Sequence, residues 1–169
     1  QQKLFQTYES SKRRQGLIQG FKVAIIGKPN VGKSSLLNKL LSYDRAITSH
    51  IAGTTRDTIE EELRIGTHLV KIVDTAGIRQ ANDVVEQVGI ERSIQAIQEA
   101  EIVIVMFDSS RSFDTEDSAI LELLDVYGTG KKIIKVLNKS DLPRLCEHPF
   151  LTQETLLLSC QESAESVIE

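Results

Sequence analysis

Short runs of apolar residues alternate along the chain with segments of helical periodicity. Continuous apolar runs are typical of buried strands, and the chain has them at residues 23–26 and 102–107; the stretches 69–73 and 133–137, each with one lysine, and the shorter 156–158 resemble them. Between them, apolar residues recur three and four positions apart at 36–41, 90–97 and 119–124, which predicts helices. Strands that alternate with helices predict an α/β domain, with a mostly parallel central sheet and helices on both faces.

One segment differs from this pattern. From Thr58 to Ile65 every second residue is mostly apolar, at Ile59, Glu61, Leu63 and Ile65, and the residues between them, Glu60, Glu62 and Arg64, are charged. Such alternation is typical of a strand with one solvated face. A turn at Gly66 leads into the run at 69–73, so we expect an antiparallel pair at the edge of the sheet. Residues 44–57 and 78–88 lack strong periodicity and are predicted to be loops.

Composition narrows the class of protein. The chain has 169 residues, of which 40% are hydrophobic and 26% charged, and this suits one globular domain. Its 20 Lys and Arg against 24 Asp and Glu give a net charge of −4, which argues against nucleic-acid binding by this domain alone. Cys146 and Cys160 form neither a disulfide framework nor a zinc motif. The apolar runs are too short for a membrane span, and we expect a cytoplasmic protein without a membrane partner.

The segment from Gly27 to Ser34 matches the full G-x-x-x-x-G-K-[ST] pattern. It follows a predicted strand and opens a predicted helix, and this context weighs against a plain glycine turn. Backbone N–H groups of such a loop converge on phosphate oxygens, the lysine bridges the β- and γ-phosphates, and the serine hydroxyl binds Mg²⁺. The predicted phosphate-binding residues are Asn30, Val31, Gly32, Lys33, Ser34, Ser35 and, from the next motif, Gly77.

That next motif, Asp-Thr-Ala-Gly at 74–77, closes the third predicted strand of the chain. A carboxylate at a strand end can hold magnesium, usually through a water. We therefore expect Asp74 to bind Mg²⁺, usually through a water, and the backbone N–H of Gly77 to face the γ-phosphate. Alone this motif also makes ordinary turns; its position after the phosphate-binding pattern favours the metal site.

Asn-Lys-Ser-Asp at 138–141 follows the run at 133–137. Guanine presents two adjacent donors that the one carboxylate of Asp141 can accept, and adenine does not. Lys139 can lay its aliphatic stem along the base, and Asn138 can tie neighbouring loops together. The backbone amides of Ser159 and Cys160 could donate to the guanine oxygen. A helix cap is the alternative interpretation, but the order of the motifs favours a GTP and GDP site over an ATP site.

With these motifs in order, residues 20–169 resemble the P-loop GTPases of the TRAFAC class, which have a Ras-like fold. Two longer strings, His-Ile-Ala-Gly-Thr-Thr-Arg-Asp at 50–57 and Gly-Ile-Glu-Arg-Ser at 89–93 after a Val-Glu pair, resemble the GTP-binding G domain of the MnmE (TrmE) family. The resemblance implies that residues 1–19 are a fragment of a flanking helical domain. It also implies that the full protein works with MnmG on the wobble uridine (U34) of tRNA.

Hydrolysis needs an oriented water, and Ile78 stands where many relatives carry a glutamine. The resemblance points to Glu86 instead, acting as a catalytic carboxylate through a bridging water, together with Lys33. From the residues alone, the favoured interpretation is that Glu86 precedes a helix expected over Val88 to Ala100, where the dipole favours an acid; the resemblance reverses this preference.

The resemblance further implies that K⁺ supplies transition-state charge when two G domains dimerise. Its ligands would be Asn30, Ser49, Ile51 and Thr54, although Asn30 could also simply brace its loop. Thr55 would be the second magnesium ligand after Ser34. Arg56 and Arg79 are the alternative source of charge. The switch residues expected to move are Ser49, Ile51, Gly53, Thr54, Thr55, Arg56, Asp57 and Arg79.

Two other functions stay open at this point. A ribosome-assembly GTPase of the Der or Era type carries similar motifs, although Der usually has proline where Ala52 stands. A GTP-binding module with little turnover is compatible with Ile78.

Overall fold

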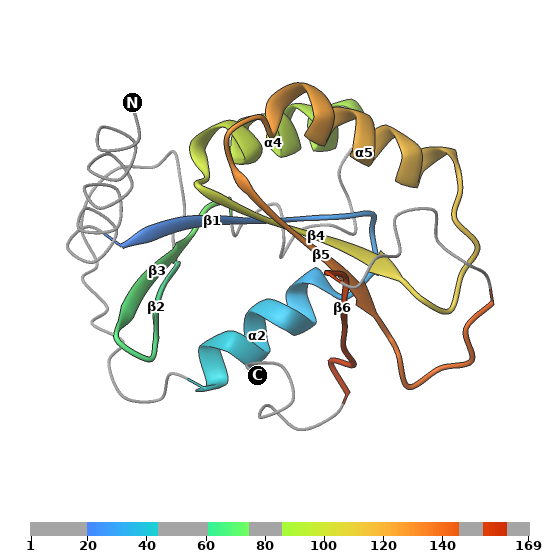
Figure 1. Cartoon of the computed structure of the whole chain (residues 1–169), viewed down its shortest axis with the longest axis horizontal. Coiled ribbons are helices and arrows are strands. Elements are labelled where there is room, and N and C mark those ends of the chain that lie inside the picture. The colour runs from blue at the N-terminus through green and yellow to red at the C-terminus, as the bar shows by residue number, and fades with distance from the viewer. Residues whose placement is uncertain (1–19, 44–60, 75–85, 146–153, 162–169) are drawn as a thin grey trace.

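A computed structural model describes residues 20–43, 61–74, 86–145 and 154–161, and shows a central sheet with helices above and below it (Figure 1). In chain order the elements are β1 (Phe21–Ile26), α2 (Lys33–Tyr43), β2 (Glu61–Ile65), β3 (His68–Ile72), α4 (Glu86–Glu99), β4 (Ile102–Asp108), α5 (Thr115–Tyr127), β5 (Lys132–Asn138) and β6 (Leu156–Leu157). Each predicted apolar run overlaps a strand, so the expected α/β class is confirmed. Residues 1–19, the predicted helical fragment, lie outside the described residues.

The six strands stand in the order β2-β3-β1-β4-β5-β6. All neighbours are parallel except β2 and β3, which pair antiparallel from Glu61 opposite Ile72 to Ile65 opposite His68. The expected antiparallel edge is therefore present, while residues 58–60 of the predicted strand fall outside the described ranges. Since β1 lies between β3 and β4, the chain leaves β1 where the strand order reverses, and this is where α/β sheets bind ligands.

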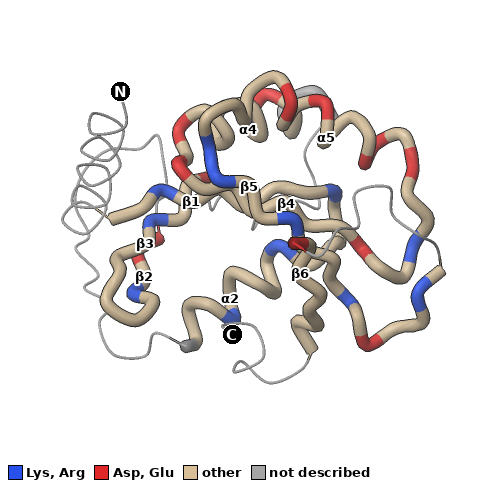
Figure 2. The backbone as a smooth tube through the Cα atoms, viewed as in Figure 1, with Lys and Arg blue, Asp and Glu red and all other residues tan. Residues whose placement is uncertain are grey.

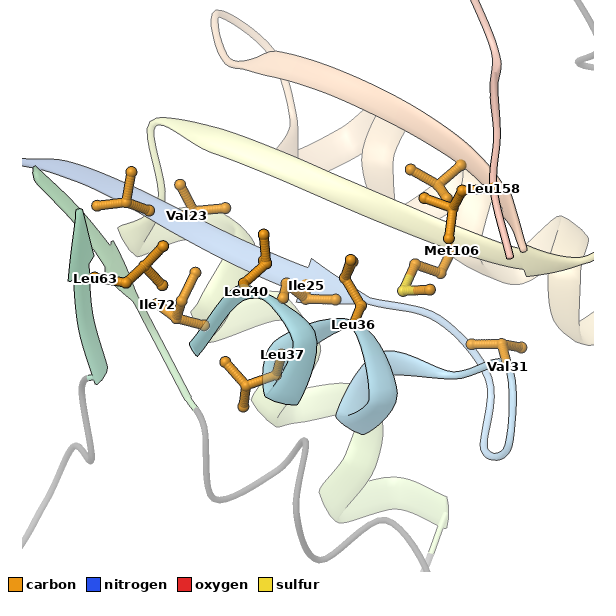
Figure 3. Close-up of a cluster of buried hydrophobic side chains, with 12 residues drawn as sticks. Val23, Ile25, Val31, Leu36, Leu37, Leu40, Leu63, Ile72, Met106 and Leu158 are labelled. Carbon is orange, nitrogen blue, oxygen red and sulfur yellow. The ribbon is translucent and has the colours of Figure 1, made fainter. Parts of the chain in front are cut away.

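Successive residues of β1 pack into different cores. Val23 and Ile25 belong to a cluster with the leucines of α2, on the face shown in Figure 3. Ala24 and Ile26 belong to a second cluster, which packs against α4 and α5. Because both faces of the strand are covered, an uninterrupted apolar run is what its position requires.

Helix α5 has a complete cap at its N-terminus. The Asp114 carboxylate accepts hydrogen bonds from the backbone N–H groups of Glu116 and Asp117, and Asp117 in turn accepts from the Asp114 N–H. This reciprocal pair fixes where the helix begins.

Acidic positions gather along α4 and α5 (Figure 2). Within the described ranges, no helix is long and apolar enough to cross a membrane.

Candidate functional site

The loop between β1 and α2, here called the phosphate loop (residues 27–32), has an unusual backbone. Gly27, Asn30 and Gly32 have φ values of 150°, 62° and 104°. The Val31 side chain is buried, and the carbonyl of Gly32 accepts the first helical hydrogen bond, from the Leu36 N–H at 2.9 Å. Strand, glycine turn and helix thus follow one another as the motif predicts.

Lys33, the first residue of α2, folds its side chain back over this loop. Its Nζ donates to the carbonyl oxygens of Gly27 at 2.6 Å and Lys28 at 2.7 Å. Burial lowers the pKa of Lys33 from 10.5 to about 8. A partly desolvated ammonium beside this loop is a strong attractant for phosphate oxygens, because low dielectric strengthens the attraction.

The base loop (residues 138–141) meets the phosphate loop through Asn138, which is 2% exposed. Its Nδ2 donates to the carbonyl of Val31 at 2.7 Å, and its Oδ1 accepts from the backbone N–H of Cys160 at 3.2 Å. This agrees with the role of loop tie that the sequence suggested. A Cβ on Gly32 would lie 2.2 Å from Asn138 Nδ2, so glycine is also needed here for the close approach of the two loops.

Two residues at the end of β4 hold the base loop from behind. Asp108 accepts from Lys139 Nζ at 2.6 Å, and the Ser109 hydroxyl donates to the Lys139 carbonyl at 2.7 Å. Burial alone would raise the pKa of Asp108, but the hydrogen bonds from Lys139 and Ser110 hold it below its ordinary value. Lys139 has a φ of 64°, and these contacts fix that left-handed conformation.

A cavity of about 420 Å³ lies between the two loops. It is lined by Asn30, Gly32, Ser35, Asn138, Lys139, Asp141, Leu142, Cys160 and Gln161. Predicted phosphate and base residues, more than a hundred positions apart in the sequence, therefore share one pocket. The Cys160 amide is already engaged with Asn138, a partner other than the guanine oxygen that the sequence suggested. Burial raises the pKa of the Cys160 thiol.

Of the other predicted site residues, Ser34, Asp74 and Glu86 lie within the described residues and the rest lie outside them. Asp74 directly follows Val73 at the end of β3, and Ser34 is the second residue of α2; carboxylate and hydroxyl oxygens are the donors Mg²⁺ prefers. Glu86 is the first residue of α4, two positions before the expected start of that helix, and its side chain is not described. Gly77 and the predicted switch residues lie outside the described residues; these are Ser49, Ile51, Gly53, Thr54, Thr55, Arg56, Asp57 and Arg79.

Sequence reasoning did not identify several residues around the site. Leu142 and Gln161 line the cavity, and Asp108 and Ser109 support the base loop. An Asp-Ser pair that closes a buried strand is a usable signal, since polar residues at carboxyl strand ends of α/β sheets gather at the site. Lys28 also gave no signal, because it occupies a variable position of its motif.

Comparison with known proteins supports the resemblance. The family model described as "50S ribosome-binding GTPase" (MMR_HSR1) matches residues 22–139. The "tRNA modification GTPase MnmE" of Aliarcobacter butzleri is 69% identical over 140 residues, which cover 83% of this chain and 31% of that protein. The protein of that name from Nitratiruptor is 67% identical over 141 residues, covering 83% and 32%. The chain thus spans about a third of these relatives, and the expected likeness to the MnmE G domain is confirmed.

A solved structure agrees in fold. Era of Aquifex aeolicus, crystallised as a point variant bound to GDP.AlF4-, superposes with a TM-score of 0.56 at 30% identity. The match covers 83% of this chain and 51% of Era. The Ras-like P-loop GTPase fold predicted from the order of motifs is confirmed by this match.

Proposed function

The chain belongs to the MMR_HSR1 family of GTPases, and we propose that it binds GTP in the cavity between the phosphate and base loops and hydrolyses it to GDP and phosphate. The observation that carries this proposal is the contact between the loops. Asn138 joins the residue before Gly32 to the segment after β6, and Gly32 and Ser35, which flank Lys33 and Ser34 in the sequence, line one cavity with Asp141. The Aquifex Era structure holds GDP.AlF4- on the same fold.

The phosphate end would take the triphosphate. Lys33 would direct its ammonium to the β- and γ-phosphate oxygens with the carbonyls of Gly27 and Lys28 still beside it, which suits an ammonium that burial has left poorly solvated. Ser34, Asp74 and Thr55 would hold Mg²⁺, which neutralises phosphate charge when bound. Gly77 would offer its N–H to the γ-phosphate.

The base end would select guanine. Asp141 is exposed to the cavity and would accept from the two adjacent guanine donors. The stem of Lys139 would lie along the base while Asp108 retains its ammonium. The amides of Ser159 and Cys160 remain candidates for the guanine oxygen, with Cys160 the weaker because Asn138 already accepts from it.

The chemical step would be attack of water on the γ-phosphorus, with cleavage of its bond to the β–γ bridging oxygen. Glu86 would orient this water through a second water, and Lys33 would stabilise the charge that develops on the leaving oxygen. Glu86 begins α4, a position that also suits an acid for reasons of helix stability alone. The catalytic role therefore rests on the likeness to MnmE.

We further propose that K⁺ stimulates turnover when two of these domains dimerise. Asn30 supports this, because its exposed side chain lies at the cavity wall and an amide oxygen suits a monovalent cation. The ligands Ser49, Ile51 and Thr54 would complete the site, and Arg56 or Arg79 is the alternative source of charge. In the full protein, the cycle would drive tRNA wobble-uridine modification with MnmG in the cytoplasm, in keeping with the name of its relatives.

The test is GTP turnover at fixed Mg²⁺, in K⁺ and then in Na⁺, over a range of protein concentrations. We expect faster turnover in K⁺ and a turnover number that rises with protein concentration, because the cation site would be completed by dimerisation. Asn30→Ala should remove the difference between the two salts. An equal, slow rate in both salts at every concentration would refute the cation and dimer mechanism and leave a nucleotide-binding domain.

A further inference from the structure

Lys28 lies inside the phosphate loop but directs its side chain away from the cavity lining, to the start of α5. Its Nζ lies 2.6 Å from Asp114 Oδ2 and 3.0 Å from Asp117 Oδ2. The Lys28 side chain is 10% exposed and that of Asp117 is 6% exposed. Lys28 thus forms a largely buried ion pair with Asp117, 89 residues away, and a second pair at the surface with Asp114, 86 residues away, whose side chain is 51% exposed.

The receiving end of this contact is rigid. Asp114 and Asp117 are the two members of the capping box of α5, so each carboxylate is already fixed by a backbone N–H. Burial alone would lower the pKa of Lys28, yet the two carboxylates raise it above its ordinary value. Lys28 therefore stays charged and bound to the end of a helix whose first turn cannot easily move.

The other end of the same residue reaches the site. The backbone carbonyl of Lys28 accepts from Lys33 Nζ at 2.7 Å. A continuous set of contacts thus runs from the cap of α5, through the Lys28 side chain and its own peptide, to the ammonium expected to bind phosphate. The loop between these points has positive φ at Gly27, Asn30 and Gly32; the two glycines adopt it without strain, whereas Asn30 carries a side chain and gains from contacts that hold the loop.

We propose that Lys28 is a positioning residue of the phosphate site: its ion pair with Asp114 and Asp117 fixes the loop peptide that places Lys33. This inference rests on the proposed GTP site. It assigns a role in nucleotide binding to α5, a helix that carries none of the nucleotide motifs.

The experiment compares three variants of the 169-residue chain by their affinity for GDP and by thermal unfolding. Lys28→Met removes the charge and keeps the stem. Lys131→Met is the matched control, because Lys131 Nζ also makes two contacts, with the carbonyls of Gln98 and Ala100, at the opposite end of the sheet. Lys28→Arg keeps the charge. We expect Lys28→Met to weaken GDP binding about tenfold, Lys131→Met to leave it unchanged, and Lys28→Arg to recover most of the loss.

A double-mutant cycle gives the second readout. Asp117→Asn keeps an oxygen for the cap but removes the charge, so it should reproduce part of the Lys28→Met loss and add little in the Lys28→Met background. Unchanged GDP affinity in Lys28→Met would overturn the proposal, as would equal losses in Lys28→Met and Lys131→Met. Since the readout is GDP affinity relative to the parent chain, it is separate from turnover; a parent chain that binds no GDP would instead refute the proposed function.

Discussion

The phosphate loop and the base loop face one cavity but are held in shape by different means. The phosphate loop owes its backbone to glycines at positive φ and to the Lys33 ammonium that closes over it. The base loop owes its shape to side chains from elsewhere, with Asp108 and Ser109 of the β4 end bonded to Lys139. Conformation encoded within a segment can be found in a motif, whereas conformation imposed by distant side chains cannot.

The largest expected effect comes from Gly32→Ala, which disturbs the contact between the phosphate loop and the base loop. The new Cβ would lie 2.2 Å from Asn138 Nδ2 at a φ of 104°, so Asn138 must leave the Val31 carbonyl. We expect a loss of about 3 kcal/mol of folding free energy and no measurable GDP binding. Denaturant unfolding and a GDP titration measure the two effects.

Gly130→Ala is the control for Gly32→Ala. Gly130 also has a positive φ, 77°, but a Cβ there meets nothing within 4 Å. This variant should show the backbone strain alone, with GDP affinity retained. If Gly130→Ala and Gly32→Ala behave alike, the close approach of the two loops is not what requires glycine.

The next effect isolates the base loop. Asp141→Asn should weaken GDP binding about a hundredfold, because a charge-assisted pair of hydrogen bonds is lost. It should strengthen binding of xanthosine diphosphate, whose carbonyl can accept from the new amide where guanine offers an amine. Competition between the two nucleotides measures the change. If the Asp141→Asn variant still prefers GDP, a residue other than Asp141 recognises the guanine base.

The smallest expected effect concerns the phosphate loop alone, and it is the dependence of GDP affinity on pH. The pKa of Lys33 is lowered to about 8, and bound phosphate would raise it again because the phosphate stabilises the ammonium. Below pH 8 the free protein already carries the proton, so GDP affinity should be level. Above pH 8 the free protein has lost it, so affinity should fall by up to about tenfold per pH unit. Titrations from about half a pH unit below that pKa to about one unit above it measure this.

Lys33→Met is the control for the pH series. It should bind GDP weakly at every pH and show a flat profile over the same range. If the parent chain is as flat as Lys33→Met, the titration of this lysine does not govern nucleotide affinity.

Much of the fold follows from local pattern. The apolar runs mark buried strands because both faces of β1 are covered, and the apolar residues three and four positions apart at 36–41 mark α2 because its leucines pack against one face of the sheet. The phosphate-binding motif at 27–34 and the base-binding motif at 138–141 likewise identify residues of the site directly. Each of these patterns is confined to one segment, so the sequence displays it directly.

The ties between segments do not follow from local pattern. Lys28 pairs with Asp117 and Asn138 with the Val31 carbonyl, over separations of 89 and 107 residues. The sequence shows that each group is polar, but its partner depends on which strands become neighbours. Helix α4 also begins at Glu86, two residues before its predicted start, because helix ends depend on the chain that precedes them.

The pairing of β4 with β5 also bears on where the chain tolerates changes in length. The two strands are in parallel register over seven residue pairs, from Ile102 opposite Lys132 to Asp108 opposite Asn138. Inserting one residue into either strand would carry its last residue about 3.3 Å past the other and turn its side chains to the opposite face. Asp108 would then miss Lys139. An insertion at Gly130, in the turn before β5, would leave that register intact, so an affinity tag or a reporter peptide is best placed there.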